Sequence, residues 1–483
     1  MSTTAEPRSA MSGWSLEPGD APRSLRAPGS AISANGAVLT RDEAQALVER
    51  TVKLATADAV RVSVSSSHTA NLRFAANQVS TAGAVNDASL TVQAAFGARH
   101  AATQTNDFSD EGLRRAVQAA EALARLAPED PESMPELGPQ QYATVDAWFE
   151  STATLSAGDR ARAALTALEP ARAAGDLAAA GFLVTSASQA AVGNNAGLFA
   201  YHRATSANYT LTVRTADGTG SGWAGADHPD WTQLDVAAVA RRAMEKARRS
   251  RNPVAVEPGR YTVILEPQAV ADLVQLIGFY ADARSADEGR SPFSKTGGGN
   301  KIGERIVNTQ VTLLSDPQDA QLLAQPWDGE GFPIGRQVWI ENGVLKQLTY
   351  SRFWAKKQGR AATGFPSSMK MSGGTASLDE MIRSTPRGIL VTRLWYLREV
   401  DPRTILYTGL TRDGTFLIEN GKVTRAVKNL RFNESPVFLL NNLEAMSRPM
   451  RVSAQESGQA GGAVVVPAVK ARDFTFTSLS DAI

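Results

Sequence analysis

One apolar segment, residues 267–280, constrains the fold of this chain more than any other feature. It follows a β-rich run, residues 261–265, and opens with Pro267, which suits the first helical position because the N–H there has no helical partner anyway. Four of its apolar residues recur at helical spacing: Val270, Leu273, Val274 and Ile277. Most of its other residues are also apolar. We therefore predict a strand followed by a helix that is buried in a core.

A charged segment follows this helix and ends in Gly289-Arg290-Ser291-Pro292-Phe293. Its charged residues are Asp282, Arg284, Asp287, Glu288 and Arg290. Two of these carboxylates could act as an acid and a base. A helix end and turn held together by ion pairs is the simpler interpretation, and the sequence leaves both open.

The helix and its closing segment resemble the TldD/PmbA family, also known as the TldD/TldE metalloproteases. In the zinc-binding members the helix carries His-Glu-x-x-x-His, with two histidine ligands and a glutamate as general base. Registering on Pro267 and on residues 289–293 places Gln275, Leu276 and Tyr280 at these three positions. Gln and Tyr are poor zinc ligands, and leucine cannot accept a proton. The family's cysteine ligand is also missing, since the chain contains no cysteine.

The resemblance therefore implies a metal-free member of the TldE/PmbA type, without catalytic residues or a cofactor of its own. Such a chain would pair with a zinc-binding TldD-type partner to degrade unfolded peptides or trim peptide precursors. Gln275 and Tyr280 would face the cavity left by the metal, or simply fill it. Further candidate residues for a cavity or groove are Asp282, Asp287, Glu288, Arg290 and Ser291.

Two other functions stay open at this point. The chain could be a metal-independent enzyme that acts on a small biosynthetic intermediate near Tyr280, Asp282 and Arg290. It could also be a homodimeric binding or scaffold protein. A ligand bound in the cavity would favour the first, and the lack of an encoded TldD-type partner would favour the second.

Composition sets broad limits on the class of protein. The chain has 483 residues, 43% of them hydrophobic and 20% charged, which is enough for two or three cores. Its formal net charge of +1 gives no reason to expect a nucleic-acid or membrane partner. It has no apolar run of about 18 residues, and its first 36 residues lack the apolar stretch of a signal peptide. We expect a cytoplasmic protein.

The N-terminal half contains an internal repeat. Residues 1–36 are rich in Ser, Pro, Gly and Ala, which predicts a disordered tail. Within residues 37–257, the stretch 89–93 matches 210–214, and a helical pattern follows each copy. We predict an α+β domain of mixed α/β type, made of two strand-hairpin-helix units with a helical insertion near residues 156–173.

Residues 258–483 change character to short strands and turns around the buried helix. Asn342-Gly343 and Asn420-Gly421 each lie between β-rich runs, which is a strong hairpin signal because both residues tolerate positive φ. These hairpins and the segment 387–392 also resemble the C-terminal domain of the family. We predict a mostly antiparallel, barrel-like β domain.

Three other motifs carry less weight. The stretch 220–225 fits Gly-x-Gly-x-x-Gly, but Pro229 and Trp231 separate it from the next helix, so it reads as a turn. Ser367-x-x-Lys370 and Lys295-Thr-Gly resemble the two motifs of enzymes that form a serine acyl-enzyme. In those enzymes Ser-x-x-Lys comes first, whereas here it comes second. No two of the four histidines have the helical spacing of a metal site.

Overall fold

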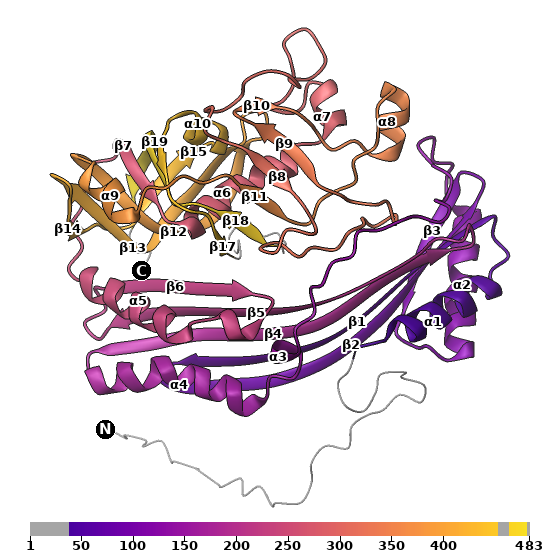
Figure 1. Ribbon diagram of the computed structural model, residues 1–483, viewed down its shortest axis with the longest axis horizontal. Coiled ribbons are helices and arrows are strands. Elements are labelled where there is room, and N and C mark those ends of the chain that lie inside the picture. The colour runs from indigo at the N-terminus through magenta and orange to yellow at the C-terminus, as the bar shows by residue number, and fades with distance from the viewer. Residues whose placement is uncertain (1–37, 453–462, 481–483) are drawn as a thin grey trace, which may run out of the picture.

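The computed structural model describes residues 38–452 and 463–480. The disordered tail predicted for residues 1–36 lies outside them. The N-terminal half is one antiparallel sheet with the strand order β3-β2-β1-β4-β5-β6 (Figure 1). Its strands are β1 (Ala59–Ala75), β2 (Gln78–Phe96), β3 (Arg99–Thr105), β4 (Leu177–Asn194), β5 (Phe199–Thr215) and β6 (Ser221–His228). Its helices are α1 (Arg41–Leu54), α2 (Asp110–Leu126), α3 (Glu150–Ala153), α4 (Ala157–Ala174), η1 (Trp231–Gln233) and α5 (Val236–Arg249).

The sheet confirms the predicted repeat of two units. The first unit is α1-β1-β2-β3-α2 and the second is α4-β4-β5-β6-α5, with β1 and β4 side by side at the centre. The helix predicted as an insertion is α4, which opens the second unit as α1 opens the first. Both helices begin with a capping box, Thr40 with Glu43 and Ser156 with Asp159. The two units bury separate apolar cores against the sheet.

The C-terminal half confirms the predicted barrel-like β domain. Strands β7, β19, β15, β13 and β12 pair in that order, and β12 closes the ring on β7 through the one parallel pairing among them. Their bounds are β7 (Gly259–Leu265), β12 (Arg387–Asp401), β13 (Leu406–Glu419), β15 (Leu430–Glu434) and β19 (Val469–Leu479). Two strands flank the barrel, β14 (Lys422–Ala426) and β16 (Leu443–Met446).

A second sheet lies beside the barrel with the order β10-β9-β8-β11-β18-β17. Its strands are β8 (Leu313–Ser315), β9 (Gln337–Glu341), β10 (Val344–Leu345), β11 (Met369–Met371), β17 (Met450–Val452) and β18 (Val464–Val466). The short helices of this half are α7 (Ala283–Asp287), α8 (Arg352–Gln358), α9 (Leu378–Arg383) and α10 (Pro436–Asn441). Both Asn-Gly turns form the predicted hairpins, β9–β10 and β13–β14, with positive φ at each turn residue.

Helix α6 (Pro267–Tyr280) is the buried helix that the sequence predicts. It packs against β7 and β12 of the barrel and against β17 and β18 of the second sheet. Every residue from Gln268 to Ile277 is buried. Pro267 occupies its first turn, as predicted. None of the described helices combines the length and apolar character needed to cross a bilayer.

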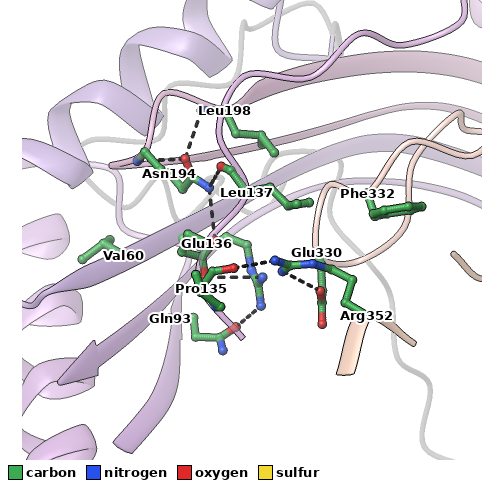
Figure 2. A network of polar contacts seen from close by, with 12 residues as sticks. Val60, Gln93, Pro135, Glu136, Leu137, Asn194, Leu198, Glu330, Phe332 and Arg352 are labelled. Atoms are coloured by element: carbon green, nitrogen blue, oxygen red, sulfur yellow. Dashed lines mark hydrogen bonds and ion pairs between the residues drawn. The ribbon is translucent and has the colours of Figure 1, made fainter. Parts of the chain in front are cut away.

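The segment between α2 and α3 joins the two halves (Figure 2). Arg352, at the start of α8, donates from Nη2 to the Pro135 carbonyl at 2.6 Å and from Nη1 to Glu330 at 3.1 Å. Glu136 accepts a hydrogen bond from Asn194 Nδ2 at 3.1 Å. It also pairs with Arg61 at 3.5 Å. Strand β1, this segment and α8 are therefore held together by charged and amide groups.

Candidate functional site

The three positions that correspond to the zinc motif lie on the second half of α6. Leu276 is only 2% exposed and belongs to the main apolar core of the C-terminal half. Gln275 is also buried, whereas Tyr280 is partly buried at the last turn. The position that the sequence register predicts for the general base therefore holds a hydrocarbon side chain surrounded by other hydrocarbon side chains.

Tyr280 points its hydroxyl at the barrel. The hydroxyl donates to the carboxylate of Glu399 and lies 3.2 Å from the hydroxyl of Tyr407. Glu399 and Tyr407 face each other across β12 and β13. Burial, together with the hydrogen bonds to Glu399 and Tyr407, raises the pKa of Tyr280 well above its usual value. Tyr280 is thus a protonated phenol held as a donor.

A buried carboxylate lies beside Tyr407 on the neighbouring strand of the barrel. Glu434 on β15 is the pairing partner of Tyr407. Burial raises the pKa of Glu434 to about 7, although its carboxylate accepts hydrogen bonds from the backbone N–H groups of Ser435 and Thr475. The sequence offered no local signal for Glu399, Tyr407 or Glu434, since they lie far from α6 in the chain and only barrel closure brings them there.

These side chains do not fit a zinc ion. Zinc in proteins takes imidazole, thiolate or carboxylate donors, usually from three or four residues. Along α6 and at its Tyr280 end the donors are the amides of Gln268 and Gln275, the phenol of Tyr280, and the carboxylates of Asp272 and Glu399, of which Glu399 already accepts the Tyr280 hydrogen bond. In the described ranges, no three His, Cys, Asp or Glu residues are grouped so as to hold a metal ion. The chemistry of α6 is that of a core helix with one buried carboxylate, Asp272, and a hydrogen-bonded tyrosine at its end.

Two of the predicted groove residues shape the turn after α6. The Asp282 carboxylate accepts a hydrogen bond from the Ser285 backbone N–H at 2.7 Å and so caps α7. The Ser291 hydroxyl donates to the Tyr280 carbonyl at 3.1 Å and accepts from the Phe293 N–H at 3.2 Å. The spacing Asp282-x-x-Ser285 is a helix-start signal that sequence reasoning could have recognised.

The other predicted groove residues are held by neighbouring side chains. Asp287 accepts hydrogen bonds from Asn300 Nδ2 at 2.7 Å and from Trp354 Nε1 at 2.8 Å. Glu288 pairs with Arg290 and with Arg284, and these hydrogen bonds lower the pKa of the Glu288 carboxyl. In this geometry the charges hold the turn in place, which matches the ion-pair interpretation of the segment.

Two pockets lie elsewhere, at the junction of the two halves. One of about 590 Å³ is lined by the β5–β6 turn and by Asp413 and Lys428 of the barrel side. Another of about 510 Å³ lies at the contacts of Figure 2, lined by Arg61, Glu136 and Arg352 among others. Within the described part of the chain, none of the eight residues predicted for the zinc positions or the groove lines either pocket.

Comparisons with known proteins agree with this architecture. Three family descriptions match in succession: PmbA/TldA metallopeptidase domain 1 over residues 60–124, the central domain over 151–251 and the C-terminal domain over 258–478. The chain belongs to the PmbA/TldD family. The resemblance seen in the sequence is thereby confirmed.

Individual relatives are distant. A metalloprotease of Methanothermobacter thermautotrophicus is 26% identical over 250 residues, which cover 48% of this chain and 52% of the relative. The metalloprotease PmbA of Escherichia coli O157:H7 is 25% identical, with 46% and 45% covered. The chain thus spans about half the length of the curated relatives it matches. The crystal structure of TldE from Thermococcus kodakarensis shares the fold, with a TM-score of 0.79, 20% identity and coverage of 90% of this chain and 99% of that one.

Proposed function

We propose that this PmbA/TldD-family chain is a non-catalytic, metal-free subunit of a zinc peptidase built from two different chains. The observation that carries the proposal is Leu276. It occupies the position of the general base and lies 2% exposed within the apolar core. A water molecule could be neither held nor deprotonated there. The zinc and the base would come from a TldD-type partner with an intact His-Glu-x-x-x-His.

The fold explains how such a subunit can lose its chemistry and keep its structure. Helix α6 contacts both the barrel and the second sheet, so it is needed whatever its surface carries. With Leu276 in place of the general base and a hydrogen-bonded Tyr280 in place of a ligand, these two positions bury no unpaired polar group. The same proposal includes unfolded peptides or peptide precursors as substrates and a cytoplasmic location.

Reconstitution tests this proposal. The chain, a TldD-type homologue from the same genome and their equimolar mixture would each be given a fluorogenic unfolded peptide and a folded protein of similar size. We expect no cleavage by the chain alone and faster cleavage of the unfolded peptide by the mixture than by the homologue. Cleavage by the purified chain alone would overturn the proposal and favour an activity of its own. No stimulation and no complex on gel filtration would favour a scaffold protein.

A further inference from the structure

The outer edge of β2 is open along half of the strand. β1 pairs with β2 along nearly its whole length, but β3 covers the other edge only from Leu90 to Phe96. In the described part of the chain, no strand or bridge lies against that edge from Gln78 to Ser89. Every residue from Gln78 to Asp87 is exposed. These ten residues present about 33 Å of backbone with unpaired donors and acceptors.

This edge lacks the residues that usually protect an open strand. Between Gln78 and Asp87 there is no proline, lysine or arginine, and Asp87 carries the one charge. Val79 and Val85 are 47% and 61% exposed. The residues between these two valines are all small: Ser80, Thr81, Ala82, Gly83 and Ala84. Such an edge pairs readily with another extended chain.

In the second unit, the equivalent strand edge is partly covered by another segment of the chain. β5 is the counterpart of β2, and β6 covers it only from Ala207 onward, as β3 covers only the last part of β2. On the remaining edge of β5 lies an extended segment of the chain itself. Ala147 forms a parallel bridge with Ala204, and its carbonyl accepts the Thr205 N–H at 2.9 Å. The Phe149 N–H donates to the Thr205 hydroxyl at 3.1 Å.

We propose that the edge of β2 from Gln78 to Ser89 binds an extended segment of an unfolded peptide, which joins the sheet as an added strand. This inference rests on the proposed function, because it gives the chain a surface that captures the peptide substrate. Main-chain hydrogen bonds supply the affinity, and the small neighbouring side chains leave room for any peptide sequence. A permanent subunit interface would need aromatic or other large apolar anchors, and this edge has two valines and no aromatic residue.

The test uses the full chain without a partner. The probe is a fluorescein-labelled, proline-free, unstructured peptide of about twelve residues, matched to the length of the edge. Its analogue carries an N-methyl group at every residue and so offers no backbone donor on either edge of the added strand. Fluorescence anisotropy would measure binding, and hydrogen exchange by mass spectrometry would locate it. We expect slower exchange over residues 78–89 when the peptide binds, and about tenfold weaker binding of the analogue.

Two double variants separate the edge from general charge effects. Val79→Lys with Val85→Lys places two lysines on the edge, which should weaken binding about tenfold because lysines there oppose strand addition. Leu123→Lys with Leu126→Lys adds the same charge to α2, where both side chains are exposed, and should bind like the unmodified chain.

Several outcomes would overturn the inference. Equal binding of the N-methylated analogue would do so, as would protection confined to other residues, or a peptide-free dimer already protected at residues 78–89. Failure of the proposed function would give a different experimental result. In that case the chain binds peptide at β2 but does not stimulate a TldD-type partner. If the edge variants stimulate the partner and bind peptide normally, only the β2 inference fails.

Discussion

At the scale of single residues, the hydroxyl of Tyr280 is hydrogen-bonded at the end of α6. It donates to Glu399 and lies 3.2 Å from that of Tyr407. We expect Tyr280→Phe to lower the free energy of unfolding by about 1 kcal/mol, the usual net value of one hydrogen bond. Stimulation of a partner's peptidase should not change. Tyr261→Phe removes a comparable bond, to the Glu257 carbonyl, and serves as the control in urea titrations. Loss of stimulation in the Tyr280 variant alone would argue for a chemical role.

Glu434 should make stability depend on pH. Its pKa is raised from 4.5 to about 7 by burial, so the folded chain binds this proton more tightly than the unfolded chain does. The resulting stabilisation is complete below about pH 4.5 and is lost as the pH rises towards 7. Between about pH 5 and pH 7.5, the wild type should therefore lose up to about 3 kcal/mol relative to Glu434→Gln. Urea unfolding of both proteins at several pH values measures this, and parallel stability curves would refute it.

At the scale of elements, α6 should not tolerate a new charge at its apolar position 276, whereas its exposed end should. Leu276→Glu places a carboxylate in an apolar core and should destabilise the fold by more than about 3 kcal/mol or prevent folding. Phe279→Glu, on the same helix at 46% exposure, should cost less than about 1 kcal/mol. Circular dichroism during thermal unfolding distinguishes them. A Leu276→Glu variant as stable as the wild type would mean that α6 is not the core helix described above.

Elements with strong local signals could be predicted from the sequence, and those that depend on long-range pairing could not. The apolar spacing and Pro267 predicted α6, and Asn-Gly predicted both hairpins. Residues 65–69 are all polar and interrupt the apolar alternation, so the sequence gives no local signal that β1 continues through them. In the structure β1 is continuous, since β2 and β4 pair with those residues from both sides. The same holds for the site. The sequence indicates which positions of α6 to consider, but it gives no local sign that Glu399 contacts Tyr280.

At the scale of the whole molecule, Asp413 is one of the carboxylates that link the two halves. Asp413 on β13 accepts two hydrogen bonds from Arg393, at 3.0 and 2.7 Å, and one from the Ser221 hydroxyl on β6 at 2.5 Å. It is 4% exposed. We expect Asp413→Asn to cost about 3 kcal/mol, because a buried guanidinium loses its counter-charge. The junction should open first, as separate calorimetric transitions for the two halves.

The control for this junction variant is an exposed ion pair. Glu245 pairs with Arg249 at 3.3 Å on the surface of α5. Glu245→Gln should cost less than about 0.5 kcal/mol and leave a single transition. Equal effects of the Asp413 and Glu245 variants would show that the buried pair does not couple the halves.

We infer that this chain contributes no metal site, and zinc stoichiometry is the measurement that decides it. The chain, a TldD-type homologue from the same genome and the complex purified from their mixture would each be dialysed against trace zinc and analysed by inductively coupled plasma mass spectrometry. We predict no bound zinc for the chain alone and one zinc per complex of two chains, supplied by the partner's His-Glu-x-x-x-His. Stoichiometric zinc in the chain alone, or two zinc ions per complex, would contradict the account.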